Sequence, residues 1–317
     1  MAPKILIVKT TSMGDVIHAL PAIHDIRRAM PKAQIDWLVE GSFADIPSLS
    51  GDVDRVFKVA VRRWRKSLFA KETRAEISAV KKALLAQKYD CVIDLQGLMK
   101  SALLARWANA PICGYDSRSI KEPIASWFYK SKFSISKSRS AIDRCRALCA
   151  KALGYEYDGT QIDFGLTFKT AVQTHKPYAA FLVNTSRETK LWPEAKWIEL
   201  GRELAQKGLG IRFLWASPEE HERVKRLAEA IGEAAYVHPR LSIAECAEVL
   251  VGSTLVVGVD TGLTHLAAAT DRPTVGLFLD YPIELVGLTG KNVRSLGGVN
   301  ANPSVDEVLA AIKEVQS

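Results

Sequence analysis

The sequence predicts an α/β protein made of two doubly wound domains, and three observations support this fold class. Apolar runs typical of strands alternate with helix-like patterns along the whole chain, which is the order that forms parallel sheets covered by helices. The length of 317 residues exceeds the size at which one core usually stops growing. A similar strand-to-helix loop follows residues 5–8 and residues 255–259. We place the domains at residues 1–170 and 171–317.

The first half contains an amphipathic helical pattern directly after its first strand. Apolar residues recur there at three- and four-residue spacing, which predicts one helix with one stripe facing a sheet. Pro21 falls in the first turns of this helix, where a missing N–H is tolerated. A later helix over residues 139–153 ends at Gly154, a residue suited to a left-handed cap. The stripe is Val16, Leu20, Ile23 and Ile26, and the expected strands are residues 4–9, 34–40, 55–60 and 90–95.

The second half repeats the pattern after a looser segment, residues 154–177, which we expect to connect the domains. Its elements again alternate, so a second parallel sheet with its own helices is expected. The expected strands are residues 178–183, 211–215, 254–259 and 274–279. The expected helices are residues 193–207, 218–231, 242–250 and 304–315.

Composition indicates a cytoplasmic protein. Hydrophobic content of 48% and charged content of 25% are ordinary for a soluble enzyme. No apolar run approaches the roughly 20 residues needed to span a bilayer, and the N-terminus lacks the features of a secretory signal. The five cysteines form no CxxC pair, so we expect reduced, mostly buried thiols. Neither a DxD-like pair in a suitable loop nor a His/Cys cluster is present, so no obligatory metal is expected.

The net charge of +8 predicts that the surface attracts polyanions. The densest basic block is residues 62–66, with Trp64 interleaved. Its guanidinium groups match carboxylate and phosphate geometry, although a solvated helix start explains such a block equally well. Charge alone does not choose among nucleic acid, anionic lipid and a phosphorylated substrate. A second basic region contains Lys121, Lys130, Lys132, Lys137, Arg139, Arg144 and Arg146.

Residues 260–265 are typical of an anion-binding helix start. Asp260 is placed as an N-cap, and Gly262 leaves the backbone open where N–H donors and the helix dipole favour phosphate. His265 lies within the next turn and is able to donate to the same anion. The alternative is a capped structural helix with a buried histidine.

The segment after the strand at residues 178–183 favours a diphosphate site. Thr185, Ser186 and Lys190 precede a helix opened by Pro193, and hydroxyls with an ammonium group can hold a diphosphate by charge-assisted hydrogen bonds. The alternative is a solvated loop that contains a turn closed by a Ser or Thr hydroxyl. Trp215 closes a strand and is a candidate to stack on a nucleobase, with a core indole as the alternative.

Asp15 follows the first strand and is a candidate general base. A carboxylate at this edge can accept the proton of an attacking hydroxyl. It can equally serve only as a cap for the following helix. His18, three residues on, is expected to line the cleft.

Six separated motifs resemble the bacterial ADP-heptose:lipopolysaccharide heptosyltransferases. They occur in the family's order and cover nearly the whole chain, so the resemblance is more specific than any single signature. The motifs are residues 9–21, 60–66, 94–101, 121–126, 190–193 and 259–266.

The resemblance implies a GT-B architecture, with two Rossmann-like doubly wound domains facing one cleft and a closing helix that crosses back to the first domain. It also implies an inverting glycosyltransferase that moves L-glycero-D-manno-heptose from ADP-heptose to the inner Kdo of Kdo-lipid A, without a cofactor. Peripheral contact with the inner face of the cytoplasmic membrane is expected, through the basic face and Trp64 or Trp127. Nucleic acid is not an expected partner.

The same resemblance assigns roles to individual residues. Asp15 is implied as the general base. The implied donor and diphosphate residues are Thr185, Ser186, Lys190, Trp215, Glu220, Asp260, Thr261, Gly262, Leu263 and His265. The implied acceptor residues are Ser12, Met13, Gly14, His18, Arg62, Arg63, Arg65, Lys66, Gln96 and Lys121.

Two departures from the family pattern limit this transfer. The family commonly has a Gly-Pro-Thr-Asp-Pro turn where this chain reads Asp280-Tyr281-Pro282-Ile283, so donor contacts in the loop from Asp280 to Glu284 are not carried over. Lys121 stands where Arg is expected in relatives. A lysine at this position offers the acceptor a single-point charge in place of the bidentate contact of an arginine.

Two alternative functions remain at this stage. A sugar-nucleotide epimerase of the same architecture would need a second acid/base group and no basic acceptor wall. A nucleic-acid-binding protein would fit the pI near 9.2, but no recognition motif of that kind is present.

Overall fold

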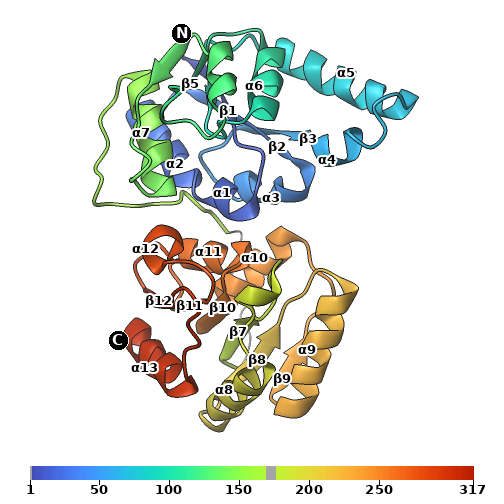
Figure 1. Cartoon of the computed structure of the whole chain (residues 1–317), viewed down its shortest axis with the longest axis vertical. Coiled ribbons are helices and arrows are strands. Elements are labelled where there is room, and N and C mark those ends of the chain that lie inside the picture. The colour runs from blue at the N-terminus through green and yellow to red at the C-terminus, as the bar shows by residue number, and fades with distance from the viewer. Residues whose placement is uncertain (1, 169–175) are drawn as a thin grey trace. The chain divides into compact units, whose positions relative to one another are not determined.

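The computed structural model describes residues 2–168 and 176–317. The chain divides into two compact units, Met1–Thr167 and Phe168–Ser317. The predicted boundary between residues 170 and 171 falls outside the described residues. Each unit contains one six-stranded sheet with helices packed against it (Figure 1). The α/β class predicted from the sequence is therefore confirmed.

The first unit holds six parallel strands. They are β1 (Lys4–Val8), β2 (Gln34–Glu40), β3 (Arg55–Val59), β4 (Cys91–Asp94), β5 (Ile112–Tyr115) and β6 (Ser131–Phe133). The α-helices are α1 (Met13–Ile17), α2 (Leu20–Ala29), α3 (Asp45–Ser48), α4 (Val61–Trp64), α5 (Lys71–Leu85), α6 (Met99–Ala105) and α7 (Ala141–Leu153). The 3₁₀ helices are η1 (Gly41–Phe43), η2 (Arg106–Ala108) and η3 (Pro123–Phe128).

The second unit also holds six parallel strands. They are β7 (Tyr178–Leu182), β8 (Gly210–Phe213), β9 (Ala235–Val237), β10 (Leu255–Val259), β11 (Thr274–Phe278) and β12 (Val293–Gly297). The helices are α8 (Glu194–Gln206), α9 (Pro218–Ile231), α10 (Ile243–Gly252), α11 (Gly262–Ala269), α12 (Ile283–Val286), α13 (Val305–Gln316) and the 3₁₀ helix η4 (Glu188–Lys190).

Both sheets have the strand order of a Rossmann fold. The first sheet runs β3-β2-β1-β4-β5-β6, and the second runs β12-β11-β10-β7-β8-β9, which is the same pattern. The order of strands reverses between β1 and β4 and between β7 and β10. Ligands of such sheets bind outside the carboxyl ends of the strands at this switch point, so the loops after these four strands are where a site is expected.

The central strands are buried on both faces, which explains their continuous apolar sequences. Residues 5–8 of β1 and all five residues of β10 are buried, as parallel strands covered by helices require. In the second unit the core also includes Phe181, which packs against Trp197 at a ring-centroid distance of 5.0 Å.

The single helix predicted after β1 is wrong, because the chain forms two helices there. α1 ends at Ile17, and α2 begins at Leu20 with Pro21 in its first turn. Pro21 has no N–H to donate to the preceding turn, so the helix restarts. The predicted cap of α7 is confirmed: Gly154 has φ of +74° and its N–H reaches the Ala150 carbonyl at 2.8 Å.

The closing helix α13 packs against the sheet of the second unit, and the crossing back to the first unit that the resemblance implied stays a prediction. α13 contacts β11, β12 and α8. Its apolar stripe belongs to the core cluster of the second unit, which explains where the helix lies. The stripe residues are Val305, Val308, Ala311, Ile312 and Val315.

The cysteines match the expectation of mostly buried thiols. All five cysteines are free, and all but the half-buried Cys91 are buried. Within the described parts of the chain, no helix combines the length and the apolarity required to cross a bilayer.

Candidate functional site

The carboxyl ends of β7 and β10 bring four of the predicted donor residues together. Lys190 Nζ donates to Asp260 Oδ2 at 2.5 Å, and His265 Nε2 lies 3.7 Å from Asp260 Oδ1. Thr185 Oγ1 donates to the backbone carbonyl of Asp260 at 2.9 Å. Burial raises the pKa of the Asp260 carboxyl, but hydrogen bonds from His265 and Lys190 outweigh burial and hold this pKa below its ordinary value. The carboxylate is therefore ionised at neutral pH.

The N-cap of α11 is Thr261, which corrects the expectation that Asp260 caps this helix. Thr261 has an extended backbone directly before Gly262, the first helical residue. Asp260 lies one position too early, and its carboxylate faces Lys190 and His265 instead. Residues 261–263 are half-buried while residues 264–269 are nearly all enclosed. The accessible part of α11 is therefore its first turn, where N–H groups favour an anion.

The loop after β11 contacts the predicted diphosphate segment, which the sequence did not reveal. Arg187 donates to the Tyr281 hydroxyl at 2.9 Å, and Thr189 Oγ1 donates to Asp280 Oδ2 at 3.0 Å. Lys190 Nζ lies 5.0 Å from the centroid of the Tyr281 ring. Family resemblance could not find these pairs because this loop departs from the family pattern. The sequence feature that could have indicated these contacts is the positive charge of Arg187 within a segment rich in hydroxyl side chains. Ser186 is exposed beside them.

Trp215 and Glu220 lie beyond the carboxyl end of β8, the strand next to β7. The Trp215 ring stacks on His221 at a centroid distance of 4.0 Å, and its Nε1 donates to the His238 carbonyl at 2.7 Å. Glu220 accepts the Ala216 N–H at 2.7 Å at the start of α9. In this structure Trp215 is thus half-buried with an aromatic partner, and Glu220 caps a helix.

In the first unit, the carboxyl end of β1 presents Asp15 to solvent. Asp15 Oδ2 accepts the Ser12 N–H at 2.9 Å, and its side chain is 48% exposed. Lys9 Nζ lies 3.7 Å from Asp15 Oδ1 and donates to the Leu95 carbonyl at 3.1 Å. The carboxylate takes part in the first turn of α1 and keeps free surface, so its geometry suits both proposed roles. The neighbouring candidates Met13, Gly14 and His18 are half-buried, and Ser12 is exposed.

Gln96 positions the loop that bears Asp15. Its Oε1 accepts the N–H groups of Thr10 and Thr11 at 2.9 and 3.0 Å. Lys100 Nζ also donates to Thr11 Oγ1, at 2.9 Å. The side-chain oxygen of Gln96 therefore accepts hydrogen bonds from the backbone that follows β1. Because Gln96 itself follows β4, these bonds link the ends of the two central strands.

Asp94 anchors the Gln96 loop from inside the core. Its carboxylate accepts the Tyr129 hydroxyl at 2.7 Å and the Ser101 hydroxyl at 2.8 Å. The N–H groups of Gln96 and Gly97 also reach it, at 2.9 and 3.2 Å. Burial raises the pKa of Asp94, and these four hydrogen bonds oppose the rise. No sequence pattern indicated this network, because its members span three elements.

The basic block is only partly available to a ligand. Arg63 makes two hydrogen bonds to Glu76, at 3.1 and 2.6 Å, and Trp64 Nε1 donates to the same carboxylate at 2.7 Å. Trp64 is buried and packs near Trp107, with ring centroids 6.3 Å apart. The expectation of a membrane contact through Trp64 is therefore wrong. The remaining basic residues Arg62, Arg65, Lys66 and Lys121 are exposed.

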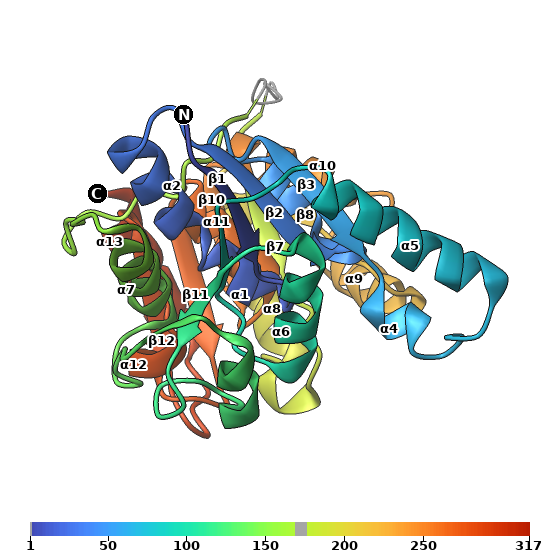
Figure 2. The same ribbon diagram turned by 90° about the horizontal axis from the view of Figure 1, so that it is seen from above.

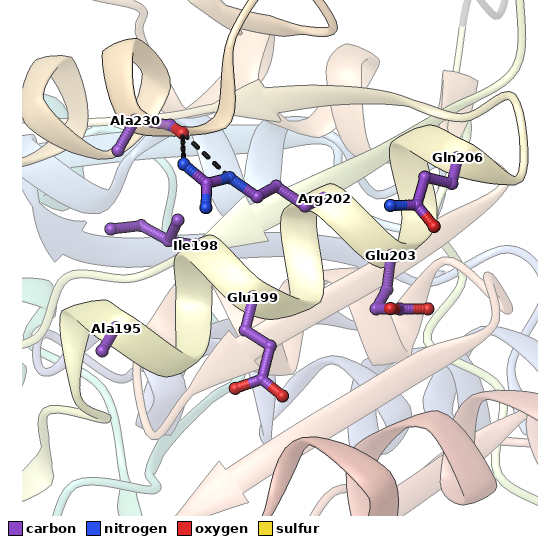
Figure 3. Close-up of a pocket in the computed structure, with 7 residues that line it drawn as sticks. All are labelled: Ala195, Ile198, Glu199, Arg202, Glu203, Gln206 and Ala230. Atoms are coloured by element: carbon purple, nitrogen blue, oxygen red, sulfur yellow. Dashed lines mark hydrogen bonds between the residues drawn. The ribbon is translucent and has the colours of Figure 1, made fainter.

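A surface hollow of about 480 Å³ lies elsewhere, along α8 (Figure 3). Arg202 crosses it and donates to the Ala230 carbonyl at 3.1 Å. None of the predicted site residues lines it. Its lining residues are Ala195, Ile198, Glu199, Arg202, Glu203, Gln206 and Ala230. In the described part of the chain, no group of three or more His, Cys, Asp or Glu side chains is arranged to hold a metal ion.

Comparisons with known proteins place the chain in one family. The model of glycosyltransferase family 9 (heptosyltransferase) matches residues 77–310. Lipopolysaccharide heptosyltransferase 1 of Salmonella typhimurium is 47% identical, covering 91% of this chain and 92% of that protein. The corresponding protein of Pseudomonas aeruginosa is 44% identical, covering 93% and 83%.

Solved structures agree with the sequence matches. The heptosyltransferase WaaC of Escherichia coli with ADP matches at a TM-score of 0.93 and 42% identity, covering 98% of this chain and 99% of that chain. The same enzyme with ADP-2-deoxy-2-fluoro heptose matches at 0.90 and 43% identity, with the same coverage. The chain therefore belongs to glycosyltransferase family 9, the heptosyltransferase family, and is a glycosyltransferase.

Proposed function

We propose that this protein is a heptosyltransferase I, which transfers L-glycero-D-manno-heptose from ADP-heptose to the inner Kdo of Kdo-lipid A and inverts the anomeric carbon. The observation that supports this most strongly is the 47% identity to lipopolysaccharide heptosyltransferase 1 over 91% of the chain. The match to the WaaC structures with ADP and an ADP-heptose analogue supports the donor.

In the proposed mechanism Asp15 is the general base. It takes the proton of the acceptor hydroxyl, whose oxygen attacks the anomeric carbon of the heptose. The bond from that carbon to the diphosphate oxygen breaks, and ADP leaves with the electron pair. The half-exposed carboxylate beside Lys9 supports this role.

The diphosphate charge is neutralised by Lys190, with Thr185 and Ser186 as hydroxyl donors and the first turn of α11 as a source of N–H groups. Asp260 and His265 hold this end of the donor site in place. Trp215, Glu220 and Leu263 complete the proposed donor residues. No cofactor or obligatory metal takes part in this mechanism, and activity is expected to persist in a chelator such as EDTA.

The acceptor binds to the first unit in this proposal. Its carboxylates and phosphates meet Arg62, Arg65, Lys66 and Lys121 by charge-assisted hydrogen bonds. Arg63 retains its hydrogen bonds to Glu76 and thereby fixes the conformation of the basic block, residues 62–66. Because the acceptor is a lipid, the protein works at the inner face of the cytoplasmic membrane as a peripheral protein.

The test is to mix the purified protein with ADP-heptose and Kdo-lipid A and to measure ADP release. ADP that forms only when both substrates are present supports the proposal. UDP-sugars in place of ADP-heptose serve as donor controls. Conversion of the donor without acceptor would support an epimerase instead, a class whose Listeria monocytogenes member shares only the fold, at a TM-score of 0.56 and 15% identity.

A further inference from the structure

Tyr281 contacts both cations of the diphosphate segment, which we define as residues 184–190. The ammonium nitrogen of Lys190 lies 5.0 Å from the centroid of the Tyr281 ring. The guanidinium carbon of Arg187 lies 5.8 Å from the same centroid, and Arg187 Nη1 donates to the Tyr281 hydroxyl at 2.9 Å. One half-buried aromatic side chain therefore touches the two positive charges that this segment offers to a diphosphate.

The loops after three strands supply the parts of this cluster. β10 lies between β7 and β11 in the second sheet (Figure 2). The diphosphate segment follows β7, Asp260 follows β10 and Tyr281 follows β11. Because the carboxyl ends of parallel strands meet at one edge of a sheet, residues that are distant in the sequence meet around Lys190.

The two partners of Lys190 act on its ammonium group in different ways. Asp260 Oδ2 accepts one of its N–H groups, at 2.5 Å. The face of the Tyr281 ring attracts the ammonium through its quadrupole but carries no net charge. An ammonium group has three N–H donors, so donors remain for phosphate oxygens. A second carboxylate in place of the ring would also attract Lys190, but its charge would repel a diphosphate.

Asp280 holds the same segment at a further point. Thr189 Oγ1 donates to Asp280 Oδ2 at 3.0 Å, and Arg187 Nη1 lies 3.7 Å from that oxygen. The loop after β11 thus contacts three residues of the diphosphate segment, whose Lys190 side chain is only 15% exposed. Side chains that are already held in place lose less conformational freedom when a ligand binds, and fixed donors stabilise a leaving group better than mobile ones.

We propose that Tyr281 is a positioning residue for the donor, whose ring fixes the ammonium group of Lys190 and whose hydroxyl fixes Arg187 at the diphosphate. This inference rests on the proposed function, in which Lys190 neutralises the diphosphate. It gives a role to a loop that departs from the family pattern and for which the resemblance implied no donor contact.

The first test is calorimetric titration of the full chain with ADP. Tyr281→Leu should weaken ADP binding by about 10-fold, because the contact of the ring with Lys190 is lost. Tyr281→Phe keeps the ring and should bind ADP within about 3-fold of the wild type. Equal affinities of the wild type and the Leu variant, or an equal loss in the Phe and Leu variants, would overturn the proposal. So would a wild type that does not bind ADP.

The matched control is Tyr236→Leu in the same unit. Tyr236 is 51% exposed on β9, and the Arg212 guanidinium lies 5.5 Å from the centroid of its ring. This variant also removes a tyrosine ring from a cation, but at a residue outside the proposed donor and acceptor sets. It should bind ADP as the wild type does, and a 10-fold loss in this variant too would contradict a specific role of Tyr281.

A second titration asks whether Tyr281 acts through Lys190. In the background of Lys190→Met the ring has no ammonium group to hold, so Tyr281→Leu should change ADP affinity by no more than about 3-fold. A further 10-fold loss in this background would show that Tyr281 acts independently of Lys190 and would overturn the positioning role. If Lys190→Met fails to fold, the comparison of the Phe and Leu variants decides the matter alone.

Steady-state kinetics separate this inference from the proposed function. Tyr281→Leu should raise KM for ADP-heptose by about 10-fold and leave KM for Kdo-lipid A unchanged, because only the donor meets Lys190. An equal rise in both KM values would overturn the positioning role. A wild type that binds ADP but releases none from ADP-heptose and Kdo-lipid A would reject the proposed function, and the titrations would still decide whether Tyr281 positions Lys190.

Discussion

Asp15 accepts a backbone N–H and still exposes about half of its side chain. The sequence left open whether this residue is a cap or a base, and the geometry permits both. A cap needs only one carboxylate oxygen, so the other remains available for proton transfer. That second oxygen, Oδ1, lies 3.7 Å from the ammonium group of Lys9.

Replacing Asp15 by Asn should therefore separate the two roles. The amide oxygen can still accept the Ser12 N–H, so the fold and ADP binding should remain. Turnover should fall by about 100-fold or more, the usual range for loss of a general base. Steady-state kinetics and calorimetric titration with ADP measure the two effects. Turnover within a few-fold of the wild type would remove Asp15 from catalysis.

At Asp260, pH and stability are linked. Its pKa in the folded protein is below the ordinary value of 3.8, so the unfolded state binds protons more readily. The stability that the ionised carboxylate contributes is complete above the unfolded pKa and is lost as pH falls through the folded pKa. The relevant window is thus acidic, below about pH 5.

Asp260→Asn should destabilise the second unit by about 2 kcal/mol at neutral pH, because Lys190 loses its partner in a mostly buried site. The deficit relative to the wild type should shrink between about pH 5 and about pH 3. Hydrogen exchange of the β10 amides reports the stability of this unit. The control is Glu222→Gln. Glu222 forms an exposed ion pair with Lys225, with Glu222 Oε1 3.3 Å from Lys225 Nζ, so little effect on stability is expected. A pH-independent deficit would contradict the assignment.

Among the elements, α7 shows how a single backbone angle ends a helix. Gly154 has φ of +74°, and a Cβ built there meets no atom within 4 Å. The only obstacle to a side chain is therefore the left-handed backbone conformation. Gly159 lies five residues on, has equally open surroundings and no positive φ.

Gly154→Ala should cost about 1 kcal/mol in the free energy of unfolding of the first unit. Gly159→Ala should leave that free energy unchanged or raise it slightly, because alanine restricts the unfolded chain. Urea unfolding of both variants gives the comparison. Equal effects at the two positions would show that the backbone angle does not determine the cost.

The strands β5, β6, β9 and β12 escaped prediction, and of these β6, β9 and β12 lie at sheet edges while β5 is a buried strand of only four residues. β6 and β9 have three residues each, and β12 is only partly buried. Strands of this length and exposure show neither a continuous apolar run nor clear alternation. The central strands β1 and β10 were predictable because burial on both faces demands consecutive apolar residues.

For the whole molecule, the net charge of +8 should make acceptor binding sensitive to salt. Several exposed cations meet the acceptor in the proposed complex, while the largely buried Lys190 meets the donor. Raising ionic strength from about 50 mM to about 300 mM should increase KM for Kdo-lipid A several-fold and KM for ADP-heptose less. Initial rates at both salt concentrations test this. Equal changes in the two KM values would contradict the assignment of the basic block to the acceptor.

The candidate site was predictable where its residues follow a central strand. Asp15, Lys190 and Asp260 all lie beyond strands whose apolar runs are evident, and the structure places Lys190 against Asp260 as expected of one site. Asp280 and Tyr281 were not predictable, because their partners Thr189 and Arg187 lie 91 and 94 residues away.

By itself the sequence determined the alternating order of strands and helices and the family, since apolar periodicity and loop motifs are written in a few consecutive residues. Tertiary structure alone decided which charges are free and which aromatic rings are exposed. Arg63 is engaged by Glu76 and Trp64 is buried, while Trp127 faces solvent. These outcomes depend on segments that meet only when the chain folds back on itself, and no local pattern encodes such long-range contacts.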